Sequence, residues 1–280
     1  LFEETAKHCH QLRLHSPIIS DADLQKVREI NVGDIRSVTL STLFDVQHSP
    51  DALKPALDKL CAQASQAIID GHCLIILSDR GVDSRWAPIP SLLATSAVHH
   101  HLIRDGTRMK VGLVVESGEP REVAHFALLL GYGAGAINPY MAFETLEDMA
   151  ETASFLAPLD YGTAVKNFIK ASRKGIVKIM SKMGISTIQS YRGAQIFEAV
   201  GLNQEFVDRY FTWTPSRIAG IGLSEVEEES RRRHASAFQE ATVAGNLDLD
   251  AGGQYQWRRD GEYHMWNPDS IAKLQHSVRT

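Results

Sequence analysis

Cysteine is scarce in this sequence, and basic residues are not in excess. The 280 residues contain three cysteines, Cys9, Cys61 and Cys73, an odd number with no two spaced like metal ligands. This scarcity favours a reducing compartment, the cytoplasm or an organelle stroma. The formal net charge is -5, so the sequence does not favour a nucleic-acid or anionic-membrane partner.

Long apolar runs and targeting signals are also missing. No stretch approaches the roughly 18 apolar residues needed to span a bilayer. The first residues, Leu1 to Glu4, lack the basic region and the apolar region of a signal peptide. The sequence starts with Leu rather than Met, and we therefore expect a segment of a longer chain.

The common motifs of catalysis and phosphate binding do not occur. There is no Gly-x-Ser-x-Gly elbow, no Walker loop and no pattern of nucleophile, base and orienting group. The glycines of residues 131–135 follow an expected helix and open an expected strand, the reverse of a dinucleotide fingerprint, so we interpret them as a turn. Residues 99–101 are three consecutive histidines, which point about 100° apart on a helix and cannot converge on one metal ion.

What the sequence does contain is a regular alternation of apolar strands and amphipathic helices. A first helix is expected at 21–29. Strands are then expected at 35–43, 73–77, 111–115, 134–137 and 185–189, with helices at 51–70, 91–104, 121–130, 143–155, 164–183 (broken near Gly175) and 194–200. Strands of continuous apolar character are typical of parallel sheets covered on both faces. The predicted class is therefore α/β with mainly parallel strands, forming a sheet or an open, barrel-like assembly.

The alternation stops near residue 202, where we place a domain boundary. Residues 206–213 are aromatic, 215–222 are loop-like, and 223–241 form a charged helix. The region 246–268 is rich in turn residues. The second segment, 203–280, therefore has no strand–helix repeat of its own, and we expect it to be an incomplete domain.

Polar residues follow four of the expected strands and are the candidate site. They are Ser78, Asp79 and Arg80, then Glu116, then Asn138 and Tyr140, and finally Ser190, Tyr191 and Arg192. If the strands are parallel, their carboxyl ends share one rim, which is where α/β folds place binding groups. The alternative is that these are only turn and helix-capping residues. Lys182 ends a stripe with Lys174 and Lys178 that is either a solvated face or a contact for a phosphate or carboxylate group.

A series of sequence blocks resembles the central domain of the glutamate synthase large chain. The blocks are residues 74–80, 88–94, 99–104, 112–122, 130–140, 174–187 and 190–202. Two further blocks, 214–222 and 261–269, resemble the beginning of the FMN-binding domain that follows it. The blocks cover nearly the whole chain in family order. They divide it into 1–202, a central domain truncated at its N-terminus, and 203–280, the beginning of an FMN domain. The resemblance implies a flavin-domain-like open or partial barrel.

The resemblance implies an oxidoreductase that makes glutamate from glutamine and 2-oxoglutarate by reductive transfer of ammonia. In the parent enzyme a glutaminase domain, FMN and an iron–sulfur cluster carry the chemistry, and an electron-donor subunit or ferredoxin supplies electrons. No family catalytic residue or metal ligand maps onto this chain, since Leu1 is not the nucleophilic cysteine. The expected role is therefore a scaffold between glutaminase and FMN domains that binds no cofactor itself, in the cytoplasm or plastid stroma. The alternative is a free-standing α/β enzyme with its site at the strand ends.

Overall fold

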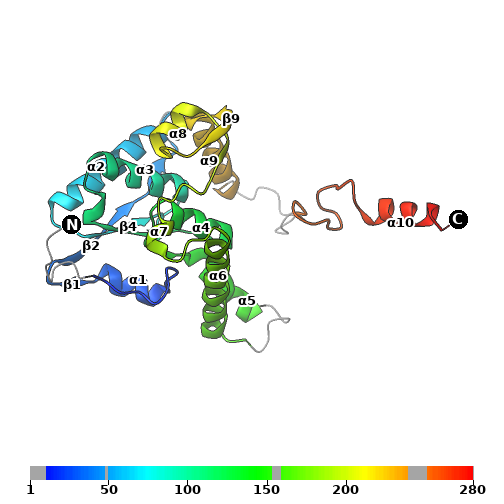
Figure 1. The fold of residues 1–280 in the computed structure, drawn as a ribbon, viewed down its shortest axis with the longest axis horizontal. Helices are drawn as coiled ribbons and strands as arrows, with labels where there is room; N and C mark the ends of the chain where they lie inside the picture. The colour runs from blue at the N-terminus through cyan, green and yellow to red at the C-terminus, as the bar shows by residue number, and fades with distance from the viewer. Residues whose placement is uncertain (1–10, 48–49, 153–158, 239–250, 280) are drawn as a thin grey trace. The chain divides into compact units, whose positions relative to one another are not determined.

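A five-stranded sheet lies at the centre of the larger part of the chain (Figure 1). The computed structural model describes residues 11–47, 50–152, 159–238 and 251–279, in two units, 1–238 and 239–280. The strand order is β1 (Asn31–Val32), β2 (Ile35–Ser41), β4 (Leu74–Ser78), β6 (Gly112–Glu116) and β7 (Ala136–Asn138). The last four are parallel, and β1 is antiparallel to β2. The predicted α/β class with mainly parallel strands is confirmed.

Three helices connect successive strands and cover one face of the sheet. They are α2 (Leu53–Ile69), α3 (Ser91–Arg104) and α4 (Val123–Gly131), with the short 3-10 helix η2 (Arg108–Lys110) before β6. Leu40, Ile75, Leu77 and Leu113 of the sheet share a core cluster with α2 and α3. In a closed (β/α)8 barrel, parallel strands also follow in chain order with their helices on one face. The sheet here has this arrangement but is open.

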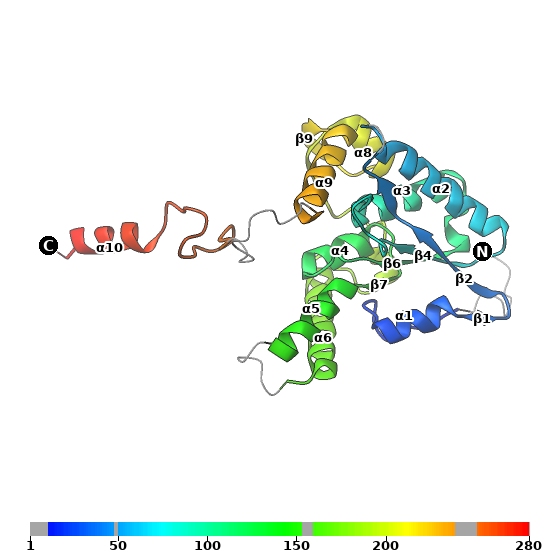
Figure 2. The same cartoon turned by 180° about the vertical axis from the view of Figure 1, so that it is seen from behind.

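The opposite face is covered by α1 (Asp21–Arg28), which lies on the other side of the sheet from α2 and α3 in both views (Figure 2). Ser20 caps this helix by accepting a hydrogen bond from the Asp23 amide. Leu24 and Val27, three residues apart and so on one side of the helix, pack on the sheet residues Ile76, Val114 and Ala136. The face that would be the interior of a closed barrel is thus filled by a helix.

A group of helices packs outside α4: α5 (Tyr140–Thr152), α6 (Tyr161–Lys182) and α7 (Ile188–Tyr191). The helix expected at 164–183 is confirmed, but the break expected near Gly175 is wrong, because α6 is continuous. A Cβ atom at Gly175 would lie 2.5 Å from Cγ2 of Val123. Glycine is needed there for close packing against the start of α4, not for a bend.

Two further expectations are wrong between residues 184 and 203. The strand expected at 185–189 is a short irregular segment followed by α7, which Thr187 caps by accepting from the Ser190 amide. The helix expected at 194–200 is irregular chain leading into β8 (Ala199–Leu202), which pairs in parallel with β9 (Ser216–Ile221) in a segment expected to be loop-like. A second small sheet joins β3 (Leu43–Asp45) to β5 (Trp86–Pro88).

The core of the larger unit continues past residue 202. From α8 (Gln204–Tyr210) and the turn after it, Phe206, Val207, Tyr210 and Phe211 join the cluster of α2 and α3. The charged helix α9 (Leu223–Phe238) follows, and Leu223 and Val226 pack on the same cluster. The division into family segments near residue 202 stays a prediction, since packing alone does not mark it.

The second unit has one regular element among residues 251–279. It is α10 (Pro268–Ser277), capped by Asn267 and Ser270, whose side chains each accept from the other residue's amide. Throughout the described residues, no helix is both long enough and apolar enough to cross a membrane.

Truncation tests where the stable unit ends. A fragment of residues 1–202 loses four buried side chains, Phe206, Val207, Tyr210 and Phe211, each worth about 1.5–3 kcal/mol on full burial. We expect it to unfold at a clearly lower urea concentration than a fragment of residues 1–238, which should match the 280-residue chain. Equal unfolding midpoints for the two fragments would show that α8 and α9 do not stabilise the core.

Candidate functional site

Four residues at the carboxyl ends of the parallel strands form one row across the sheet. The pairing register aligns Ser41 with Ser78, Ser78 with Glu116, and Glu116 with Asn138. Side chains alternate along a strand, so this row is on the α1 face, two residues beyond Ile76, Val114 and Ala136. We call this row, together with its neighbours Asp79, Arg80 and Tyr140, the carboxyl rim.

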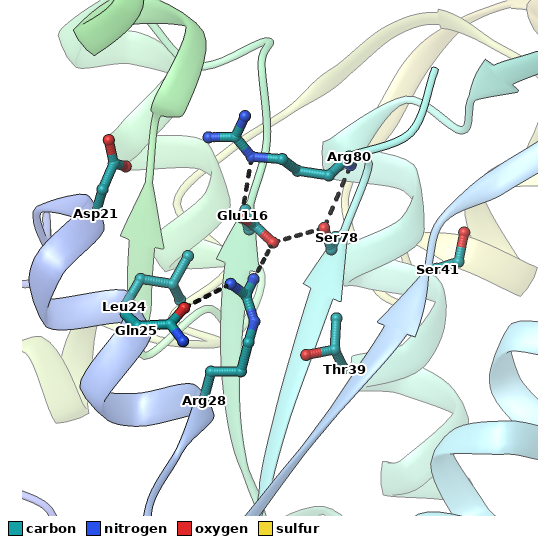
Figure 3. Close-up of a pocket in the computed structure, with 9 residues that line it drawn as sticks. All are labelled: Asp21, Leu24, Gln25, Arg28, Thr39, Ser41, Ser78, Arg80 and Glu116. Carbon is teal, nitrogen blue, oxygen red and sulfur yellow. Dashed lines mark hydrogen bonds and ion pairs between the residues drawn. The ribbon is translucent and has the colours of Figure 1, made fainter. Parts of the chain in front are cut away.

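Glu116 is at the centre of the rim and has three donor groups around a side chain that is 3% exposed (Figure 3). Ser78 Oγ donates to its Oε2 at 2.6 Å, and Arg28 of α1 reaches the same oxygen at 2.6 Å. Arg80 Nε donates to Oε1 at 3.2 Å. A buried carboxylate needs such partners, because removing it from water otherwise costs several kcal/mol.

Asp79 is a second buried carboxylate, 3% exposed, on the loop after β4. Ser117 Oγ donates to it at 2.6 Å and the Gly118 amide at 3.1 Å. Burial raises the pKa of the Asp79 carboxyl, while hydrogen bonds from Ser117, Tyr140 and Gly118 lower it. Burial, followed by the nearby Asp79 charge, raises the pKa of the Tyr140 phenol. These contacts join the loops after β4 and β6 to the start of α5.

Arg80 and Asn138 complete the network. The Arg80 guanidinium lies over the Tyr140 ring, 3.8 Å from its centroid, and donates to Glu144 Oε1 at 2.9 Å. Asn138 is fully buried, and its Nδ2 donates to Asp21 Oδ1 at 2.7 Å and to the Ile19 carbonyl at 3.2 Å. The rim therefore holds both α1 and the segment before it.

A cavity of about 740 Å³ opens between α1 and the strand ends (Figure 3). It is lined by Asp21, Leu24, Gln25, Arg28, Thr39, Ser41, Ser78, Arg80 and Glu116. The lining combines hydroxyl, carboxylate, carboxamide and guanidinium groups with one apolar side chain, Leu24. It offers many hydrogen-bonding groups, but the central carboxylate is already engaged on both oxygens.

The chemistry available at the rim is limited by these internal contacts. Ser78 donates to a carboxylate rather than to a histidine base, so it lacks the partner that activates a nucleophilic serine. Within the residues that the structure describes, no group of three or more His, Cys, Asp or Glu side chains could hold a metal ion. Ser78, Arg28 and Arg80 are thus engaged with Glu116.

Six of the ten predicted residues come together at the rim: Ser78, Asp79, Arg80, Glu116, Asn138 and Tyr140. The prediction that Arg192 shares this rim is wrong, because the residues directly before it, 185–191, form an irregular segment and α7 rather than a strand. A Cβ atom at Gly135, before β7 begins, would lie 3.6 Å from Arg192 Nη1, so Arg192 is at the amino ends of the strands. Ser190 is exposed on α7, and Tyr191 is buried with its hydroxyl donating to the Ala127 carbonyl.

Lys182 is also away from the rim. The start of α6 is near the rim, because Tyr161 there feels the charges of Asp21, Glu147 and Glu144. Burial first, and then these charges, raises the pKa of the Tyr161 phenol. The helix then runs for 22 residues, or about 30 Å at ~1.5 Å per residue, before it reaches Lys182. Lys182 is exposed there, as a solvated face would be.

Arg28, Asp21, Gln25 and Glu144 were not predicted as site residues, because no motif or strand end marks them. Arg28 and Asp21 belong to a helix that could be predicted, but its place on the sheet could not. Glu144 is on α5, one turn after Tyr140, and this spacing could have signalled a shared partner.

The opposite ends of the strands carry a cluster of basic groups. Arg108 donates to His99 Nδ1 at 2.8 Å, to the Val111 carbonyl at 2.7 Å and to the Gly133 carbonyl at 2.8 Å. Burial, and then the neighbouring Arg108 charge, lowers the pKa of His99 to about 3. His99 is thus a neutral acceptor in a structural contact with Arg108.

Comparison with protein families gives a match to the glutamate synthase central domain over residues 1–203. The chain is 43% identical over 279 residues to the NADPH glutamate synthase large chain of Bacillus subtilis, covering 100% of this chain and 18% of that protein. It is 40% identical over 284 residues to the ferredoxin-dependent glutamate synthase of Pyropia yezoensis, covering 98% and 18%. It is 36% identical over 281 residues to the NADH glutamate synthase of Schizosaccharomyces pombe, covering 100% and 13%.

The chain therefore spans less than a fifth of the length of these relatives. Among solved structures, a mutant flavocytochrome b2 with benzoylformate is similar at a TM-score of 0.40 and 16% identity, over 48% of this chain and 31% of that one. A likeness at that level carries no argument about function.

Two carboxylates that share Arg80 provide a matched test of the rim. Glu116 is 3% exposed and Glu144 is 46% exposed. Glu116→Gln removes the acceptor charge for two guanidinium groups, and we expect it to lower the free energy of unfolding by about 2–4 kcal/mol. Glu144→Gln should lower it by less than about 1 kcal/mol, as for other exposed pairs. Urea denaturation of the 280-residue chain measures both, and equal losses would contradict the central role of Glu116.

The buried neutral His99 predicts a dependence of stability on pH. Its pKa is lowered in the folded state, so its contribution to stability is present above the unfolded pKa of about 6.5 and is lost as pH falls toward about 3. Between pH 7.5 and pH 5, protonation of this one residue in the unfolded state should lower the free energy of unfolding by about 2 kcal/mol.

His99→Gln, which keeps an acceptor for Arg108, should reduce the difference in unfolding free energy between these two pH values by that amount. His15→Gln, at an exposed position, is the control and should leave the difference unchanged. An unaltered difference in the His99 variant would show that His99 does not titrate on unfolding.

Proposed function

The chain belongs to the glutamate synthase central domain family over residues 1–203, and from this premise we propose that it is a connecting, non-catalytic part of a glutamate synthase large chain. In this proposal, residues 1–202 are the central domain and 203–280 begin the FMN-binding domain. The complete enzyme would make glutamate from glutamine and 2-oxoglutarate by reductive transfer of ammonia. The scarcity of cysteine fits a cytoplasmic or plastid-stromal enzyme.

The observation that carries the proposal is the engagement of both rim carboxylates. Glu116 accepts from Ser78, Arg28 and Arg80, and Asp79 accepts from Ser117 and Gly118. A general base or nucleophile needs an atom free to approach a substrate. These groups instead hold a helix and the two loops after β4 and β6 in fixed positions, which is what a domain between two catalytic domains requires.

The proposed scaffold role also implies where the cofactors of the complete enzyme are bound. FMN and an iron–sulfur cluster would belong to other parts of the large chain, and this segment would bind neither. Its partners would be the glutaminase and FMN domains of the same polypeptide. The electron donor, a nicotinamide nucleotide through a partner subunit or ferredoxin, would act on the parent enzyme and not on this segment.

The rim would face the FMN domain and help to couple the two half-reactions. Arg80 is the residue best suited to this role, because its side chain is 45% exposed while its Nε is held by buried Glu116. Charged groups at an interface act mainly by fixing register and orientation. A displaced rim should then let ammonia escape before it reaches the synthase site.

Ammonia released per glutamate formed tests this role. In a full-length glutamate synthase carrying this segment, Arg80→Ala should raise that ratio about twofold or more, as expected for an interface contact worth roughly 0.5–1 kcal/mol. Glutamine hydrolysis should change less, since its nucleophile is elsewhere.

The control is Arg232→Ala, which removes an exposed arginine that pairs with Glu228 on the same helix, α9. It should leave the ratio unchanged. If substitutions at Arg80, Glu116 and Asn138 all leave the ratio at the wild-type value while the proteins remain folded, the rim has no part in coupling, and its residues are only turn and capping groups.

A further inference from the structure

The small sheet of β8 and β9 is unusually exposed for a parallel pair. Its register joins Ala199 to Ser216, Val200 to Ile218, and Leu202 to Ile221. Parallel strands are normally covered on both faces, and a sheet of two strands is at best marginally stable alone. Five of the six residues of β9 are nevertheless exposed, and both views place this strand at the periphery of its unit (Figures 1 and 2).

The exposed surface of this sheet is apolar. Val200 is 68% exposed and Ile218 is 60% exposed. Because the two residues are paired in register, their side chains project from the same face and form one patch. Ile221 is 36% exposed, so three β-branched residues of this sheet lie at least partly in solvent.

The conformation of this ladder is specific. A Cβ atom at Gly220 would lie 2.2 Å from the Gly201 carbonyl oxygen, so the two backbones approach more closely than any other residue would allow. Gly201 has a φ of 78°, which favours glycine, at an irregularity in the register. A loop that only connected two helices would need neither feature.

The main sheet shows how this protein covers an edge strand. The outer edge of β7 is paired with the segment before α1: the Ile137 amide donates to the Pro17 carbonyl at 2.7 Å, and the Ile19 amide donates to the Ile137 carbonyl at 2.9 Å. By contrast, β9 pairs with β8 alone within the described part of the chain. The free edge of such a strand presents unpaired backbone N–H and C=O groups, and with apolar side chains beside it this edge is a template for another strand.

We propose that β9 is an internal strand in the full-length protein, and that a strand from the same polypeptide, outside residues 1–280, pairs with its free edge. Apolar side chains of that strand would lie beside Ile218 and extend the patch formed by Val200 and Ile218. The length of chain outside this segment supports an occupant from the same polypeptide, since these 280 residues are 18% of the Bacillus subtilis relative. The inference rests on the proposed function only in placing this segment within a longer large chain.

Hydrogen exchange tests the proposal independently of enzyme turnover. Amides of residues 216–221 should exchange about tenfold or more slowly in the full-length protein than in the 280-residue chain, because a new ladder withdraws them from water. Amides of α2 serve as the internal reference in both proteins. Equal exchange of 216–221 in the two proteins would overturn the proposal.

Matched substitutions in the full-length protein identify the surface. Ile218→Lys, with Val200→Lys as a second variant, should remove the added protection of residues 216–221 while α2 remains protected. Val177→Lys is the control, since Val177 is 59% exposed but lies on α6. If residues 216–221 keep the added protection in both the Ile218→Lys and the Val200→Lys variants, the inference is contradicted. So does protection of the 280-residue chain that rises with its concentration, which would indicate pairing with a second copy. Neither result would bear on ammonia coupling.

Discussion

Burial of the Glu116 carboxylate is the constraint on which the arrangement of this domain depends. A carboxylate that is 3% exposed is tolerated only if its charge is paired and its oxygens are hydrogen-bonded. Its partners come from three places: Ser78 at the end of β4, Arg80 on the following loop, and Arg28 on α1. One side chain thus joins two strand ends to a helix that is 88 residues away in sequence.

That constraint decides what the inner face of the sheet can be. In a closed barrel of this strand order, the inner face is packed by side chains of the other strands. Here α1 takes their place through Leu24 and Val27, and Arg28 secures it to Glu116. The strand ends keep the geometry of a barrel rim, but their acids hold the fold together. This is the physical basis for proposing that the segment is a scaffold.

Expectations from the sequence failed where local pattern and tertiary packing disagreed. Residues 185–189 have the β-branched character of a strand, but Ile185 and Ile188 pack on the α4 and α6 cluster, and Thr187 caps a helical turn. Gly175 has the lowest helix propensity except for proline, yet it lies inside α6 because Val123 occupies the space of a side chain. The positions of the rim residues were predicted more successfully, because the carboxyl ends of parallel strands share one edge of a sheet when the strands are paired without a register shift.

The sequence by itself determined the α/β class, most helices and strands up to residue 183, the family, and six of the rim residues. The family depends on its characteristic sequence blocks, and the other three depend on short-range periodicity or on residues at or just after the end of a strand. Only the tertiary structure decided that α1 covers the inner face, that Arg28 and Arg80 converge on Glu116, that Arg192 is at the other end of the sheet, and that β9 pairs with β8 and remains open. These depend on contacts between residues far apart in the chain, where burial, charge pairing and edge hydrogen bonds select one arrangement among many that the local pattern allows.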